Sequence, residues 1–263
     1  VMKKKILFLM PSMFIGGAER SLLGLLNTID YEKYDVSLFL YRHEGEFFSC
    51  VPSKVHLLTS IPEYGTFDIP IKDLFMDGRI RFGMARLWSK ISMRLHCMKT
   101  HEEMGVWMEM QYISKSLLTL LPQIPGRYDV GISFLGIPDV LLEKVDAKKK
   151  IAWIHTDYSS VEGINYEELR QSYSGLDKIV AVSSACGETF TKLFPELRGN
   201  MMEVENILPQ SIIRKDAEAF DGENEMPVIK DGFRLLSIGR YCIAKNFDNV
   251  PAICSCLLKK GFK

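Results

Sequence analysis

The chain has 263 residues, of which 47% are apolar and 25% are charged, and its 33 basic side chains match its 33 acidic ones. This composition is typical of a globular protein and excludes a disordered or collagen-like chain. A net charge of zero gives no support to nucleic-acid binding, which normally requires a basic excess. The six cysteines are scattered without metal or redox spacing, so we expect reduced thiols in a cytoplasmic protein.

The first two hundred residues alternate between apolar runs and helical patterns. Residues 6–10 form a short apolar run that ends at Pro11, which predicts a strand buried on both faces. Leucines at helical spacing follow over 22–29, and 35–41 restores strand character, which predicts a βαβ unit. The whole pattern predicts a doubly wound α/β domain with a parallel sheet. Further strands are expected at 54–58, 128–134, 150–154 and 178–182, and further helices at 113–121, 166–173 and 185–194.

The composition changes after residue 208. Residues 209–232 contain prolines, glycines and several acids, which predicts a linker. A buried strand is expected at 234–238 and a helix at 250–258. We therefore expect a Rossmann-like domain over 1–208, a linker, and only the first βα unit of a second Rossmann-like domain over 233–263. The chain is then expected to be the front part of a longer protein.

Two loops follow predicted strands and carry candidate site residues. Gly16 and Gly17 join the first strand to the first helix, where free N–H groups attract anions and glycines allow close approach of a ligand. A tight turn without a ligand is the alternative. His155 follows the strand at 150–154, and it either contacts a reacting sugar or bonds a neighbouring loop. Ser183 and Ser184 are predicted to cap the helix at 185–194. The sequence contains no cluster of residues at metal-ligand spacing.

Two further features are basic. Arg240 and Lys245 bracket a loop after the strand at 234–238 and suit a diphosphate, although isolated cations are commonly only solvated. From 79 to 99 six bases and no acid accompany apolar residues at helical spacing. This pattern predicts either a helix in an anionic membrane interface or a surface helix packed through its apolar stripe. The membrane-facing candidates are Arg86, Trp88, Lys90 and Arg94.

Taken in order, six segments resemble retaining glycosyltransferase family 4 (glycosyl transferase group 1) enzymes with the GT-B fold, of the bacterial surface-polysaccharide type. The segments are ILFLMPSMFIGGAERSLLGLLN, YDVGISF, IAWIHTDYS, DKIVAVSSACGETFTKLFP, NILP and LLSIGRYCIAKNFDNV. The resemblance implies transfer of a sugar from a nucleotide-sugar to a polysaccharide or lipid-linked acceptor. The donor that the family resemblance favours is a UDP-sugar. It implies no metal or other cofactor, and a place in the cytoplasm or at the inner face of the plasma membrane.

The resemblance also implies roles for single residues. His155 matches the histidine near the transferred sugar. Glu19 and Asp157 are acceptor- or sugar-side candidates. The donor diphosphate is expected at Gly16, Gly17, Arg240 and Lys245. The family's paired glutamates, with seven residues between them, do not occur after Lys245 here, so we expect the chain alone not to turn over.

Two other readings stay open. A nucleotide-sugar epimerase can share the two-domain architecture, and it would need carboxylate acid–base groups, for which Asp157 is the one well-placed candidate. A non-catalytic module that binds the nucleotide-sugar or the acceptor is the second.

Overall fold

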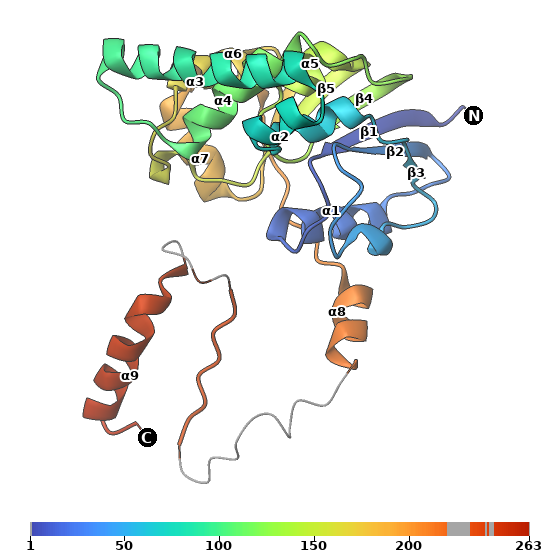
Figure 1. Cartoon of the computed structure of the whole chain (residues 1–263). Coiled ribbons are helices and arrows are strands. Elements are labelled where there is room, and N and C mark those ends of the chain that lie inside the picture. Colours follow the sequence, from blue (N-terminus) through green and yellow to red (C-terminus); the bar gives the residue numbers. More distant parts are fainter. Residues whose placement is uncertain (1, 220–231, 240, 242–244, 263) are drawn as a thin grey trace. The chain divides into compact units, whose positions relative to one another are not determined.

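The computed structural model describes residues 2–219, 232–239, 241 and 245–262. The chain divides into two compact units, Val1–Gln210 and Ser211–Lys263 (Figure 1).

The first unit is built on a parallel sheet, which confirms the predicted fold class. Within the described residues its seven strands have the order β3-β2-β1-β4-β5-β6-β7. The order therefore runs outward in both directions from β1, and the reversal lies between β1 and β4. A reversal of this kind defines the topological switch point of a doubly wound sheet. The strands are β1 (Lys4–Met10), β2 (Tyr34–Leu40), β3 (His56–Leu57), β4 (Arg127–Ser133), β5 (Asp146–Ile154), β6 (Lys178–Ala181) and β7 (Met201–Glu203).

Strand β1 is buried on both faces, as its apolar run predicts. Leu7 and Leu9 belong to the main core cluster, together with Phe39 of β2. Phe8 and Met10 are as fully buried but point to the opposite face, because successive side chains of a strand alternate. Both faces of the sheet are therefore covered, which is the condition for a parallel sheet.

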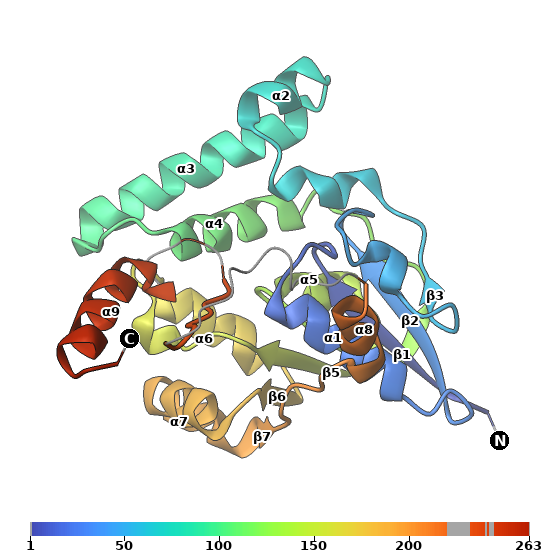
Figure 2. The same ribbon diagram turned by 90° about the horizontal axis from the view of Figure 1, so that it is seen from below.

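Helices lie on both faces (Figures 1 and 2). Helix α1 (Gly17–Thr28) lies on one face, and α4 (Val106–Leu118) and α5 (Asp139–Lys144) lie on the other. Helix α3 (Ile80–Thr100) packs against α4 and α2 (Ile71–Met76), and Figure 2 shows it on the outer side of α4. Helices α6 (Tyr166–Ser174) and α7 (Ser184–Leu193) follow β5 and β6.

Of the two serines expected to cap α7, Ser183 is the cap, whereas Ser184 is the first residue of the helix and donates to the carboxylate of Glu203. The side chain of Ser183 accepts a hydrogen bond from the backbone N–H of Cys186. This bond satisfies one of the free N–H groups of the first helical turn.

Helix α1 is tied to the segment 206–209 at its outer side. The hydroxyl of Ser21 donates to Oδ1 of Asn206 at 2.7 Å. A Cβ atom at Gly24 would lie 2.0 Å from the carbonyl oxygen of Ile207, so only glycine allows this approach. The segment read from the sequence as NILP is thus packed on the first helix.

The second unit differs from its prediction in two respects. Helix α8 (Gln210–Ala217) lies inside the predicted linker, whose residues 220–231 are outside the described ones. Residues 233–238 have no regular structure and are exposed, so the expected buried strand is wrong. A strand needs a neighbour for its N–H and C=O groups, and the described part of this unit contains no second strand. The predicted helix is present as α9 (Val250–Lys259).

Among the described helices, none combines the length and the apolar character that crossing a bilayer requires.

Candidate functional site

The carboxyl ends of the parallel strands meet at one edge of the sheet, where doubly wound proteins bind ligands. The register places Leu9 of β1 opposite Ser133 of β4, and Ser133 opposite Ala152 of β5. The loops after these three strands therefore begin at the same level. Gly16, Gly17 and His155 all follow this edge, as the sequence predicts.

The glycine loop ends at the start of α1. Gly16 is the N-cap residue and supplies no side chain to cap the helix. The carboxyl group of Glu19 lies over it, since a Cβ on Gly16 would come 2.1 Å from Oε2 of Glu19. A Cβ on Gly17 would meet nothing within 4 Å. The open side of the helix start is therefore at Gly17, and Glu19 occupies the side of Gly16.

His155 is the predicted site residue with the most distinctive environment. Its ring centroid lies 5.0 Å from that of Phe134, and its Nε2 is buried with no hydrogen-bond partner among the described residues. Burial lowers the pKa of His155 to about 4, and a hydrogen bond to the backbone of Phe134 acts in the opposite direction. The imidazole is consequently neutral near pH 7.

Asp157 lies just beyond His155 and has a structural role. Its carboxylate accepts hydrogen bonds from the N–H of Ser159 at 3.0 Å and from the hydroxyl of Ser159 at 2.7 Å. It thereby caps the short helical turn Tyr158–Ser160. This arrangement accounts for an aspartate here without a ligand.

A cavity of about 400 Å³ opens at the same edge of the sheet, close to the switch point. The ends of β1, β2 and β4 contribute to its wall, and so do α3 and α4. Its wall combines aromatic rings with a few charged groups, the lining that small-molecule sites favour. Its lining residues include Pro11, Tyr41, Arg42, Tyr64, Phe67, Asp68, Arg86, Glu109, Ser114 and Gly136.

Arg86 belongs to this cavity, and its prediction as a membrane-facing residue is wrong. It is 7% exposed, and Nη1 donates to the carbonyl oxygens of Thr66, Phe67 and Ile69 at 3.0, 2.6 and 3.2 Å. The buried Nε has no partner among the described residues. Burial lowers the pKa of the guanidinium, whereas Glu109 opposes that shift. A guanidinium is charged at any physiological pH, so the cavity contains a fixed cation.

The other charged groups of the cavity were not identified from the sequence. Arg42 contacts Glu44 at 2.6 Å and Asp68 at 3.1 Å. It lies two residues after the end of β2, so the rule that selected His155 would have found it too. Near the cavity, burial raises the pKa of Asp139 although the hydroxyls of Ser172 and Ser114 donate to its carboxylate.

Aromatic side chains form one wall of the cavity. The rings of Tyr41 and Phe67 stack with centroids 5.6 Å apart, and Tyr64 lies 5.5 Å from Tyr41. The hydroxyl of Tyr64 donates to the carbonyl of Pro122, so this ring is held in place. The cavity thus has an aromatic wall beside its charged groups.

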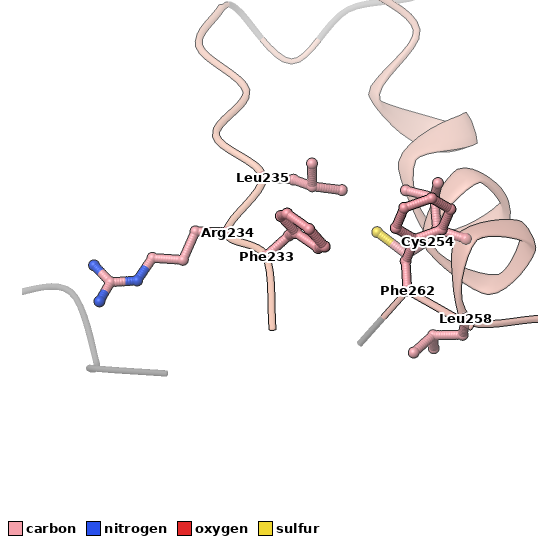
Figure 3. Close-up of a pocket in the computed structure, with 7 residues that line it drawn as sticks. Phe233, Arg234, Leu235, Cys254, Leu258 and Phe262 are labelled. Carbon is pink, nitrogen blue, oxygen red and sulfur yellow. The ribbon is translucent and has the colours of Figure 1, made fainter. Parts of the chain in front are cut away.

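The remaining predicted donor residues belong to the second unit. Arg240 lies outside the described residues, and Lys245 is exposed. This unit contains a cavity of about 360 Å³. Figure 3 shows its lining residues, which lie on the extended chain and on α9 and the end that follows it. Phe233, Leu235, Leu258 and Phe262 line it, and the side chain of Arg234 points away from it. Among the residues that the structure describes, the lining of this cavity is mainly apolar.

No group of three or more metal-ligating side chains is present in the part of the chain that the structure describes.

The fold and the cavity define the class: a doubly wound α/β domain with a cavity close to its switch point. No protein-family model matches the chain, and no curated protein matches it at a significant level.

Solved structures of Anabaena Alr3699/HepE are similar to it. The complex with UDP and glucose has 14% identity and a TM-score of 0.37, covering 77% of this chain and 44% of that one. The UDP complex has 14% identity and a TM-score of 0.39, and covers 82% and 50%. The UDP-glucose complex has 13% identity and a TM-score of 0.37, and covers 81% and 50%. The chain spans half the length of these structures or less.

Proposed function

We propose that the chain carries the acceptor-side domain of a retaining glycosyltransferase. The enzyme moves a sugar from a nucleotide-sugar, a UDP-sugar by preference, to a polysaccharide or lipid-linked acceptor of a bacterial surface glycan. It acts in the cytoplasm, at the inner face of the plasma membrane, and without a metal. The observation that carries the proposal is the cavity at the switch point, with its aromatic wall and the fixed cation Arg86.

In this reaction the bond from the anomeric carbon to the donor phosphate oxygen breaks, and its electron pair leaves with the nucleoside diphosphate. The acceptor hydroxyl oxygen forms the new bond to the same carbon, and its proton passes to the departing phosphate oxygen. Growing negative charge on the leaving group has to be stabilised by cations and free N–H groups. Gly17 at the start of α1 supplies such N–H groups, and we assign Arg240 and Lys245 to the same charge.

His155 has the role of a hydrogen-bonding group for the transferred sugar. Its neutral ring and unpaired Nε2 suit a sugar hydroxyl better than a phosphate, since a phosphate would favour a charged imidazolium. The cavity beyond β1, β2 and β4 is assigned to the acceptor. The carboxylates Asp68 and Glu109 can accept from acceptor hydroxyls there, and the aromatic wall can cover the apolar face of a sugar ring.

The test compares binding of nucleotides with binding of nucleotide-sugars by isothermal titration calorimetry. We expect one of UDP-, GDP- or ADP-sugar to bind more tightly than its nucleotide. In His155→Gln that preference falls by about tenfold, the value of one hydrogen bond, and the affinity for the nucleotide alone is unchanged. His56→Gln, on exposed β3, is the matched control and keeps the preference. If wild type and His155→Gln show the same preference for the nucleotide-sugar, the role of His155 is contradicted. If none of the three nucleotides and three nucleotide-sugars binds, the proposed function is contradicted.

A second pair of variants tests whether Lys245 binds the donor diphosphate. Lys245→Ala is expected to weaken binding of the nucleotide itself, whereas Lys259→Ala, an exposed lysine of the same unit, is not. Equal affinities in the two variants would remove Lys245 from the donor site.

A further inference from the structure

Helix α3 presents a row of large apolar side chains to solvent. Each of its seven members is between 42% and 74% exposed. We call this row the apolar stripe; it consists of Ile80, Met84, Leu87, Trp88, Ile91, Leu95 and Met98. Continuous exposed apolar surface of this size marks an interaction site in a folded protein.

The apolar stripe lies opposite the face through which α3 is packed. At about 100° per residue, its seven members fall within an arc of about 100°. The buried residues Arg86, Ser89 and Met93 fall on the far side of the helix. Gly83 is covered by the ring of Phe75 from α2, since a Cβ there would come 2.9 Å from that ring. The alternative in which α3 packs through its apolar stripe is therefore wrong.

Basic side chains border the apolar stripe on both sides. Arg81 and Lys99 lie along one border, and Lys90 and Arg94 along the other, by the same helical spacing. All four are exposed, and none makes an ion pair with any residue that the structure describes. No acid occurs between 78 and 101.

The acids nearest in sequence lie beyond the two ends of the helix. Asp73 and Asp77 belong to α2 and its end, and Glu102 and Glu103 follow α3. Glu102 is paired with His96 at 2.8 Å. The charged residues that border the apolar stripe along α3 are thus all basic.

This charge pattern decides between the possible occupants. A second copy of α3 placed on the apolar stripe would bring bases against bases, with no acid to pair with them. A surface of anionic lipid is complementary, because lysine and arginine stems can lie on the apolar region while their charged ends reach the headgroups. Trp88 suits the same interface, since tryptophan gathers where an apolar and a polar phase meet.

We propose that α3 docks in the interface of an anionic bilayer, with its axis parallel to the surface and its apolar stripe among the acyl chains. The 21 residues of α3 form a contact about 30 Å long. The inference gives the membrane location proposed above a structural basis, but it does not depend on the proposed reaction. It is a property of α3 alone and holds whatever ligand the cavity binds.

The test is co-sedimentation of the full chain with vesicles of phosphatidylcholine, with and without phosphatidylglycerol. We expect sedimentation with the anionic vesicles only, and weaker binding at higher salt. Trp88→Glu/Ile91→Glu removes the apolar contact, and Lys90→Glu/Arg94→Glu reverses one border. Each is expected to lower the partition coefficient by tenfold or more. For Lys90→Glu/Arg94→Glu the loss follows from about 1 kcal/mol per base near the surface, and for Trp88→Glu/Ile91→Glu it follows from the loss of two apolar contacts. The control Lys3→Glu/Lys192→Glu makes the same charge change at exposed sites away from α3 and keeps wild-type binding.

Folding of each variant is checked by its far-ultraviolet circular dichroism. A second readout is tryptophan emission, which shifts to the blue when wild type binds, whereas Trp88→Phe still sediments without this shift. The proposal is overturned if wild type does not bind anionic vesicles. It is also overturned if the two α3 variants are folded and bind as tightly as wild type. A dimer seen by light scattering that disappears in Trp88→Glu/Ile91→Glu, without vesicle binding by wild type, assigns the apolar stripe to a second copy and also overturns it.

Discussion

The guanidinium of Arg86 donates through Nη1 to the carbonyl oxygen of Phe67 at 2.6 Å, and this bond joins the inner face of α3 to the chain that precedes α2. Nη1 also reaches the carbonyls of Thr66 and Ile69. One buried cation thus satisfies three backbone acceptors, and it faces the cavity at the same time.

Arg86→Met should destabilise the first unit. The apolar stem is retained, but the carbonyls of residues 66, 67 and 69 lose their donor, and a buried acceptor without a partner costs about 1–3 kcal/mol. We expect the free energy of unfolding to fall by about 3 kcal/mol in urea titrations. Arg81→Met, at an exposed position of the same helix, should change it by less than about 0.5 kcal/mol. Equal effects would show that the carbonyl contacts of Arg86 do not stabilise the fold.

The stability of the protein should depend on pH through His155. Its pKa is about 4 in the folded chain and about 6.5 when unfolded, so between these values the unfolded chain binds a proton that the native chain does not. The free energy of unfolding therefore decreases as the pH falls through this window. Between about pH 7.5 and about pH 5 wild type should lose about 2 kcal/mol more than His155→Gln, which does not titrate. Thermal and urea unfolding at both pH values provide the measurement. Parallel curves for the two proteins would mean that the ring is not desolvated.

Gly24 provides a test of how α1 meets the segment 206–209. Alanine normally favours a helix over glycine by about 1 kcal/mol. At Gly24 the new methyl group would lie 2.0 Å from the backbone oxygen of Ile207, and a clash with backbone cannot relax cheaply. Gly24→Ala is therefore expected to destabilise by about 1–3 kcal/mol. Gly17→Ala in the same helix meets nothing within 4 Å and is expected to be neutral or stabilising, as measured by thermal unfolding. A stabilised Gly24→Ala would contradict the contact.

The sheet could be predicted from the sequence because its strands are short apolar runs between turn residues. β1, β2, β4, β5 and β6 all lie where such runs predict them, and β3 was expected at its site but contains only His56 and Leu57. β7 was missed, because Met201–Glu203 is three residues long and only partly buried, so it has no apolar run. The strand expected at 234–238 has such a run but no neighbour to pair with in the described part of its unit. A local pattern does not contain that information.

The site was predictable only in part, for a related reason. His155 directly follows β5, and Gly17 ends the connection from β1 to α1, so the carboxyl-edge rule selects both from sequence alone. The cavity depends instead on which side of α3 faces inward. The helical pattern of 79–99 gives the same periodicity for an apolar face packed inward and for one turned to solvent. Only tertiary contacts, such as the carbonyls around Arg86, distinguish the two, and they reverse the expected orientation of that residue.

The polar attachment of α3 separates folding from surface chemistry along one helix. Because its inner face is fixed by Gly83, Arg86, Ser89 and Met93, the seven apolar positions outside contribute little to the core. Substitutions on the two faces should therefore register in different assays, the inner ones in unfolding curves and the outer ones in partitioning. A version of this protein with a polar outer face on α3 would keep its fold and its cavity, and it would report on the chemistry of the cavity in plain solution.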